Sequence, residues 1–203
     1  MIAIIDYGMG NLRSVEKGFL KVGIDARVVT HPGAVDDAQA IVLPGVGSFK
    51  DCMSNLEDMS LVDPLVRSIQ KGKPYLGICL GLQVLFTESE EFGLCKGLHI
   101  FEGKVVRFHV DLKVPHMGWN NISISRRPPI LKGIEDEAFF YFVHSFYVVP
   151  YNTDIIATTT DYGIRFTSMI WKDNIFATQF HPEKSQEMGL RIQKNFGDFS
   201  KKA

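Results

Sequence analysis

The residues with the clearest chemical potential in this 203-residue chain form the segment Gly77-Ile78-Cys79-Leu80-Gly81. It lies between an apolar run at residues 74–79, which predicts a strand, and a helical stripe that starts at Leu82 and continues through Leu85 and Phe86. Gly-x-Cys-x-Gly between a strand and a helix is the cysteine counterpart of the Gly-x-Ser-x-Gly nucleophile elbow. Such a turn strains the nucleophile's backbone, and the flanking glycines avoid clashes.

The elbow predicts that Cys79 is a nucleophile whose thiolate is favoured by the N-terminus of the following helix. The backbone amide of Leu80 would then point to the place where an oxyanion forms. The alternative is that Cys79 is a small buried hydrophobic residue, as free cysteines often are. Cys52 and Cys95 lack this frame of two glycines between a predicted strand and a predicted helix, and for them this second interpretation is preferred.

A nucleophilic cysteine needs a general base, and the base needs a group that orients it. His181 directly follows an apolar run at residues 175–180, and Pro182 favours extended backbone before it. Residues i and i+2 of an extended segment project to the same side, so Glu183 can hold one ring nitrogen of His181. A solvated turn is the other interpretation of this segment. His144 is the rival base, but it has no carboxylate at i+2.

Pro44-Gly45-Val46-Gly47 follows the predicted strand at residues 40–43. Its glycines allow backbone amides to approach a ligand closely, so Val46 and Gly47 are candidates for a second oxyanion donor beside Leu80. An ordinary glycine turn is an equally good interpretation of this loop alone. The glycines do not form a nucleotide motif, because Arg13 and Lys50 stand where the dinucleotide fingerprint needs a small residue. No pairs of cysteine or histidine have zinc spacing, so no metal or cofactor is predicted.

Composition limits the classes of function. The net charge of −1 gives no field that would recruit nucleic acid or an anionic membrane. Three cysteines are too few for a disulfide scaffold, and an acidic residue at position 6 argues against a signal peptide. No apolar run approaches the ~18 residues of a membrane span. We therefore expect a globular protein in the reducing cytoplasm.

The elements that would position these residues alternate between strand and helix in the first half. Strands are predicted at residues 2–6, 26–30, 40–43 and 74–79, with helical patterns after the first and last of them and a helix at residues 64–71. This order implies a mostly parallel central sheet covered by helices on both faces.

The second half adds an antiparallel β region, with strands predicted at residues 105–110, 121–125, 137–149, 154–160, 165–171 and 175–180. A last helix is predicted at residues 186–199. The sequence contains no linker or repeat, so residues 1–203 are predicted to form one α/β domain.

Taken together, the elbow, the glycine loop and the late His-Pro-Glu motif resemble the class I (triad) glutamine amidotransferases. Further segments resemble, within that class, the glutaminase subunits of imidazole glycerol phosphate synthase. These segments cover nearly the whole chain: Asp6-Tyr7-Gly8-Met9-Gly10-Asn11-Leu12, Pro44 to Phe49, Pro115-His116-Met117-Gly118-Trp119-Asn120 and Tyr141 to Phe146.

The resemblance implies hydrolysis of glutamine to glutamate and ammonia by a Cys79–His181–Glu183 triad. In the family, ammonia passes to a (β/α)₈-barrel cyclase subunit, which makes imidazole glycerol phosphate and aminoimidazole carboxamide ribotide for histidine biosynthesis. The partner's ligand activates the glutaminase. The resemblance implies a heterodimer interface and signal relay at Pro115, His116, Met117, Gly118, Trp119 and Asn120.

Carried over by motif, the expected glutamine contacts are Gly45, Gly47, Gln83, Glu91, His144, Ser145 and Phe146. The family often has tyrosine where Phe146 stands, so only a backbone contact is expected at that position. Three alternatives stay open: a glutaminase subunit for anthranilate or pyridoxal phosphate synthesis, a cysteine hydrolase or peptidase on a similar sheet, and a binding module that keeps an inactive triad.

Overall fold

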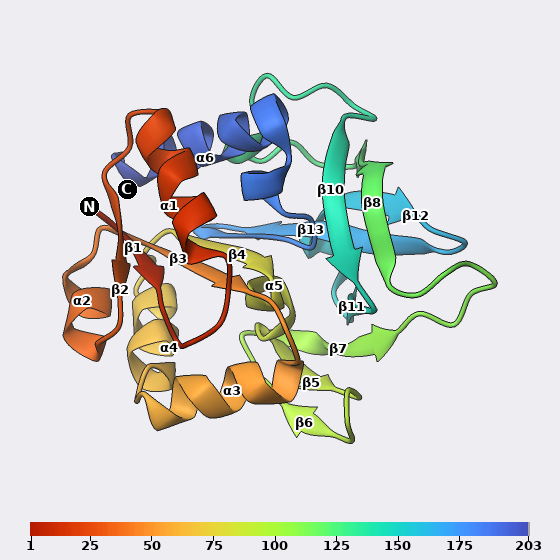
Figure 1. Cartoon of the computed structure of the whole chain (residues 1–203), viewed down its shortest axis with the longest axis horizontal. Coiled ribbons are helices and arrows are strands. Elements are labelled where there is room, and N and C mark those ends of the chain that lie inside the picture. The colour runs from red at the N-terminus through yellow and green to blue at the C-terminus, as the bar shows by residue number, and fades with distance from the viewer. Residues whose placement is uncertain (203) are drawn as a thin grey trace.

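The computed structural model describes residues 1–202; Ala203, the last residue of the predicted domain, lies outside the described residues. A twisted sheet runs through the middle of the molecule, with helices on both of its faces (Figure 1). The helices are α1 (Leu12–Lys21), α2 (Pro32–Asp37), α3 (Phe49–Asp58), α4 (Val62–Gln70), α5 (Leu80–Gln83) and α6 (Gln186–Ser200), with short 3₁₀ turns η1 (Pro129–Leu131), η2 (Thr153–Ile155) and η3 (Pro182–Lys184).

The parallel part of the sheet has the strand order β2-β1-β3-β4-β14. Its carboxyl ends therefore lie along one edge, where ligands bind in open α/β sheets. These strands are β1 (Ile2–Ile5), β2 (Ala26–Val29), β3 (Ala40–Gly45), β4 (Tyr75–Cys79) and β14 (Ile175–Thr178).

The parallel strands are buried on both faces, which explains why they appear in the sequence as continuous apolar runs. Along β1, Ala3 and Ile5 belong to the core that includes α3 and α4, whereas Ile2 and Ile4 belong to the core beneath α1 and α6. This division follows from the alternation of side chains along a strand. The two cores pack against opposite faces of the sheet and so fix the position of its carboxyl edge.

The sheet continues beyond β14 in the order β13-β11-β7-β5-β6, where all neighbours are antiparallel except β7 and β5, which are parallel. β12 pairs with both β13 and β9. Two further strands, β8 and β10, form a separate antiparallel ribbon that stands across this end of the molecule (Figure 1). The strands are β5 (Phe86–Ser89), β6 (Cys95–Lys96), β7 (Phe101–Arg107), β8 (His116–Asn121), β9 (Ser123–Ile124), β10 (Phe139–His144), β11 (Phe146–Pro150), β12 (Ile156–Asp161) and β13 (Arg165–Lys172).

The predicted fold class, a mostly parallel sheet between helices with an added antiparallel region, is confirmed. Three details were wrong. The predicted strand at residues 137–149 is two strands that break at Ser145 and join different sheets. The helical stripe from Leu82 to Phe86 is a single turn, because the chain leaves α5 at Val84 and enters β5. Residues 116–121 form β8, although no strand was predicted before residue 121. Among residues 1–202, we find no helix of the length and hydropathy that would span a membrane.

Candidate active site

Three neighbouring parallel strands deliver the candidate residues to the same edge of the sheet. Gly45 at the end of β3 pairs with Cys79 at the end of β4. On the other side of β4, Ile78 pairs with Thr178, the last residue of β14, and the chain then continues to His181. The predicted nucleophile, glycine loop and base therefore meet because their strands are adjacent, although they lie far apart in the sequence.

The backbone at Cys79 has the strain expected of a nucleophile elbow. Its φ of 55° and ψ of −102° are rare for a residue with a side chain. A Cβ at Gly77 would overlap the carbonyl of Gly81, and a Cβ at Gly81 would overlap the carbonyl of Leu43. Only glycine therefore fits at these two positions, so the turn explains both glycines of the motif.

His181 and Glu183 form a buried pair on the segment that follows β14. Nδ1 of His181 lies 2.8 Å from Oε1 of Glu183, and the two side chains are 1% and 2% exposed. Burial alone would lower the pKa of His181, but the coulombic influence of Cys79 and the hydrogen bond and charge of Glu183 outweigh it and raise that pKa to about 10. These contacts therefore favour the ring once it has gained a proton, which suits a group that accepts the proton of a thiol.

The second ring nitrogen of His181, Nε2, is also buried, and it has no hydrogen-bond partner within residues 1–202. Cys79 is close enough for its charge to act on the imidazole. Catalytic hydrogen bonds are often long in structures without substrate. The arrangement is that of a thiol and an imidazole poised to share one proton.

The glycine loop after β3 packs against Tyr7 and Leu80. A Cβ at Gly45 would overlap the Tyr7 hydroxyl, and Gly47 has a φ of +100° that favours glycine. The Tyr7 hydroxyl is buried and has no hydrogen-bond partner in the described part of the chain. Burial, followed by the neighbouring Cys52 thiol, raises the pKa of Tyr7 far above its usual value. Tyr7 therefore stays protonated beneath the loop.

A cavity of about 500 Å³ opens above Cys79. Ten of the residues predicted from the sequence line it: Val46, Gly47, Cys79, Leu80, Gln83, Glu91, Pro115, His144, Ser145 and Phe146. Gly45 lies beneath the loop rather than in the wall. Val143 and Lys184 complete the lining and were not predicted. The volume is in the range that accommodates a small polar molecule.

Gln83 and Glu91 both line the cavity, and their existing hydrogen bonds determine which of their atoms can bind a ligand. Nε2 of Gln83 donates to the carbonyl of Phe146 at 3.1 Å and to Oε1 of Gln179 at 3.2 Å. Both amide hydrogens are thus used, and Oε1 is the atom that Gln83 can offer to a ligand. Oε2 of Glu91 accepts from the Phe49 backbone N–H at 2.6 Å, while burial raises the pKa of this half-buried carboxyl.

His144 and His116 belong to a buried hydrogen-bond chain. Nδ1 of His144 donates to the Phe146 carbonyl at 2.8 Å, and Nε2 of His144 lies 3.0 Å from Nδ1 of His116. Nε2 of His116 lies 3.3 Å from Nδ2 of Asn120. Burial lowers the pKa of His144 to about 3 and of His116 to about 4, so both rings are neutral. One ring nitrogen of His144 is therefore held by the Phe146 carbonyl and the other lies against His116. This arrangement argues against His144 as the general base.

The ribbon of β8 and β10 has two different faces. Met117 and Trp119 are 62% and 47% exposed and point outward, together with Phe139 and Tyr141. His116 is buried, and Gly118 and Asn120 alternate with the outward residues. Lys184, whose ammonium lies 5.6 Å from the centre of the Tyr141 ring, connects the outward face to the cavity lining. The predicted interface segment thus divides into a surface and an interior part.

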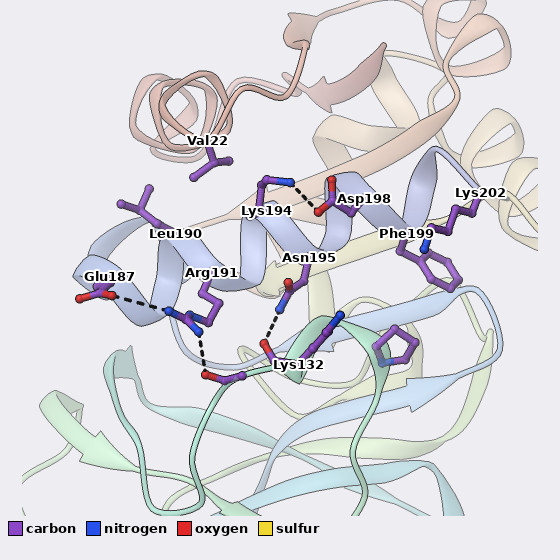
Figure 2. Close-up of a pocket in the computed structure, with 12 residues that line it drawn as sticks. Val22, Lys132, Glu187, Leu190, Arg191, Lys194, Asn195, Asp198, Phe199 and Lys202 are labelled. Carbon is purple, nitrogen blue, oxygen red and sulfur yellow. Dashed lines mark hydrogen bonds and ion pairs between the residues drawn. The ribbon is translucent and has the colours of Figure 1, made fainter.

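A second hollow, of about 600 Å³, lies between α6, the turn at η1 and the end of α1 (Figure 2). Its charged groups are largely paired with each other: Arg191 with Glu187 and the Gly133 carbonyl, and Lys194 with Asp198. It contains no cysteine or histidine among its lining residues. No group of three or more potential metal ligands occurs anywhere in residues 1–202. The elbow cavity is therefore where these side chains can do chemistry.

A family model described as glutamine amidotransferase class-I matches residues 3–198. The chain therefore belongs to the class-I glutamine amidotransferase family. Solved structures have the same fold: PurLQS from Thermotoga maritima has a TM-score of 0.74 at 17% identity, covering 98% of this chain and 97% of its own. The glutaminase domain of Trypanosoma brucei CTPS has a TM-score of 0.68 at 17% identity, covering 99% and 93%.

More similar relatives specify the branch of the family. The chain is 58% identical to "Imidazole glycerol phosphate synthase subunit HisH" of Syntrophotalea carbinolica, over 98% of this chain and all of the relative. It is 58% identical to the HisH subunit of Geobacter sulfurreducens, over 97% of this chain and 98% of the relative. It is 53% identical to the HisH subunit of Methanothermobacter thermautotrophicus, over 97% of this chain and 97% of the relative. The chain is a HisH-type glutamine amidotransferase, as the resemblance in its sequence predicted.

Proposed function

We propose that this chain is the glutaminase subunit of an imidazole glycerol phosphate synthase, acting in histidine biosynthesis through Cys79, His181 and Glu183. The single observation that carries the triad is the buried His181–Glu183 pair at 2.8 Å beside a strained cysteine elbow. The identity of 58% to HisH subunits over nearly the full length supports the pathway. All of residues 1–203 form the glutaminase domain in this proposal.

In the proposed reaction, His181 takes the proton of Cys79, and the sulfur attacks the side-chain carbonyl carbon of glutamine. The carbonyl π electrons move to oxygen, and the oxyanion is held by backbone amides of Leu80 and of the loop residues Val46 and Gly47. When the C–N bond breaks, the proton on His181 goes to the leaving nitrogen and ammonia departs. Glu183 holds the imidazole throughout.

A glutamyl thioester on Cys79 remains after ammonia has left. Water, deprotonated by His181, attacks its carbonyl carbon, the C–S bond breaks and glutamate is released. The substrate is held by the groups lining the cavity: Oε1 of Gln83, the Glu91 carboxylate for the α-ammonium group, and the backbone of His144, Ser145 and Phe146. Gly45 contributes by allowing the loop to pack closely against Leu80.

The proposed partner is a (β/α)₈-barrel cyclase that docks on the outward face of the β8–β10 ribbon and uses the ammonia. Exposed Met117 and Trp119 suit such a surface because methionine and tryptophan are enriched at interfaces. Pro115 and Lys184 join this face to the cavity, so a docked partner would cover the cavity mouth. We place the complex in the cytoplasm, where free cysteines such as Cys79 stay reduced.

The proposal is tested by measuring glutamate release from glutamine by the chain alone, with the cyclase, and with the cyclase plus its nucleotide substrate. We expect release to rise sharply in the third condition and to vanish in Cys79→Ser. Release that depends on Cys79 but is indifferent to the cyclase would contradict the pathway. Release that persists in Cys79→Ser would contradict the nucleophile.

A further inference from the structure

Gln179 contacts the nucleophile directly, although neither the triad nor the substrate contacts proposed above include it. It is the first residue after β14 and its side chain is fully buried. Its Nε2 donates to the sulfur of Cys79 at 3.5 Å, a normal distance for a hydrogen bond to sulfur. A buried amide committed to a cysteine sulfur needs an explanation, because an ordinary structural glutamine would bond to stronger acceptors.

The orientation of the Gln179 amide is forced by its neighbours. The carbonyl of Phe146 can only accept hydrogen bonds, and Gln83 is 3.1 Å from it, so the group of Gln83 that faces it must be the NH₂. The same NH₂ lies 3.2 Å from Gln179, which must present its oxygen there. The NH₂ of Gln179 is then turned toward Cys79 and cannot be exchanged with the oxygen without breaking this chain.

The Cys79 thiolate needs a hydrogen-bond donor because the helix dipole behind it contributes little stabilisation. The helix behind the elbow, α5, contains only the four residues Leu80–Gln83, so its dipole is that of a single turn. Cys79 is also buried, at 6% exposure, which removes most of the water that would solvate a thiolate. A hydrogen bond from a fixed amide replaces part of that lost solvation and restricts where the sulfur can lie.

We propose that Gln179 is a catalytic residue that donates a hydrogen bond to the Cys79 thiolate, in an orientation fixed by Gln83 and the Phe146 carbonyl. The inference rests on the proposed role of Cys79 as nucleophile. Proton balance is simple: the thiol proton goes to Nε2 of His181, the sulfur keeps the electron pair, and Gln179 retains both amide hydrogens. Once sulfur bonds to the carbonyl carbon, its charge passes to the oxyanion and the contact with Gln179 weakens.

The test is the rate of alkylation of Cys79 by iodoacetamide as a function of pH, followed on the Cys79 peptide by mass spectrometry in the full-length protein. Gln179→Met keeps the length of the side chain and removes the donor. We expect the midpoint of the pH profile to move upward by about one pH unit, which corresponds to roughly a tenfold lower thiolate fraction on the rising limb. With the cyclase bound, kcat should fall by a larger factor than KM for glutamine rises, because Gln179 contacts the sulfur directly and the substrate only through Gln83.

Gln193→Met is the matched control, since Gln193 is equally buried but lies on α6, where it donates to the Val15 carbonyl. It should leave the alkylation profile unchanged. Gln179→Asn is measured in parallel, because it keeps an amide in the site but withdraws the donor by one methylene; it decides the question should Gln179→Met fail to fold. A midpoint unchanged in the folded variant overturns the role of Gln179.

The wild-type profile separates this inference from the function on which it rests. A wild-type midpoint near that of an ordinary thiol, about 8.5, would contradict an activated nucleophile and with it the proposal for Gln179. A low wild-type midpoint that Gln179→Met leaves in place contradicts only the role of Gln179. A low midpoint that rises in both Gln179 variants, and not in Gln193→Met, supports both.

Discussion

The charge state of His181 is set by its contacts with Cys79 and Glu183. Their attraction overcomes the burial of the imidazole and raises its pKa to about 10, so the site favours the ring after it has accepted a proton. Oε1 of Glu183 accepts from Nδ1, which leaves Nε2 as the nitrogen that faces the thiol. Glu183 therefore orients the base and contributes, together with Cys79, to its raised pKa.

Replacing Glu183 by Gln should therefore lower kcat by about 10²-fold or more, the usual contribution of an oriented acid–base group. The amide keeps the shape of the carboxylate but removes the charge that holds the imidazolium. Glutamate release in the presence of the cyclase and its nucleotide measures the effect. Glu187→Gln is the control, because that side chain is 80% exposed on α6. Equal activity of the two variants would contradict the triad.

The residues of the proposed triad could be singled out in the sequence because their spacing is local. Two glycines flank Cys79, and Glu183 lies two residues from His181, so the chemistry is visible within short segments. Gln179 and Tyr7 could not be predicted in the same way. Gln179 reaches Cys79 and Gln83, which are 100 and 96 residues away, and such contacts depend on which strands become neighbours.

At the scale of elements, the ribbon of β8 and β10 separates two environments. The outward side chains are exposed and apolar, whereas His116 and His144 lie inside among aromatic rings. His116 stacks on Phe142 at 4.8 Å and on Tyr162 at 4.0 Å between ring centres. Uncharged neighbours of this kind give no compensation for a buried positive charge, which explains the lowered pKa of His116.

This burial predicts how stability depends on pH. Unfolded histidines bind protons below about pH 6.5, whereas folded His116 and His144 do so only near pH 4 and pH 3. The free energy of unfolding should therefore fall as pH drops below about 6.5, by up to about 1.4 kcal/mol per pH unit for each histidine. Urea unfolding of the wild-type chain between pH 7 and pH 5 measures this slope.

His116→Phe should reduce the slope of unfolding free energy against pH by about the contribution of one histidine. This expectation holds even if the substitution changes the absolute stability. His109→Phe provides the comparison, because exposed His109 can be solvated in both states. An unchanged slope in His116→Phe would contradict the neutral buried pair.

The elements themselves were predictable to different degrees. The parallel strands were recognised because burial on both faces makes them continuous apolar runs, and α6 has the predicted start and nearly the predicted end. β8 was missed because its inward positions carry His116, Gly118 and Asn120 instead of the apolar residues that mark a strand. His116 and Asn120 are tolerated there because their side chains have hydrogen-bond partners inside the protein. The break at Ser145 was missed because both flanking strands are rich in aromatic and β-branched residues.

Across the whole molecule, the ribbon of β8 and β10 stands at one end of the sheet (Figure 1), and residues of this ribbon or next to it also form part of the cavity wall. Pro115, Val143 and Lys184 belong to or adjoin the ribbon and also line the cavity. A partner bound to the outward face would therefore shield the cavity from water. In the proposed complex, this arrangement would let partner binding control access to the cavity.

Trp119→Ala should weaken binding of the cyclase by about 2 kcal/mol, roughly 30-fold, because exposed tryptophans at interfaces are often binding hot spots. The free energy of unfolding should change little, since the ring is already half exposed. Isothermal titration calorimetry measures the first quantity and urea unfolding the second. Leu20→Ala, an exposed apolar residue on α1, is the matched control. Unchanged affinity in Trp119→Ala would contradict docking on this face.

The nucleophilic role of Cys79 is tested most directly by looking for the glutamyl thioester on this residue. The chain, the cyclase and its nucleotide are mixed with glutamine and quenched in acid, and the Cys79 peptide is analysed by mass spectrometry. We expect a mass increase equal to glutamine minus ammonia on that peptide, and none in Cys79→Ser. Steady glutamate release with no adduct on Cys79, or with an adduct on Cys52 or Cys95 instead, would contradict it.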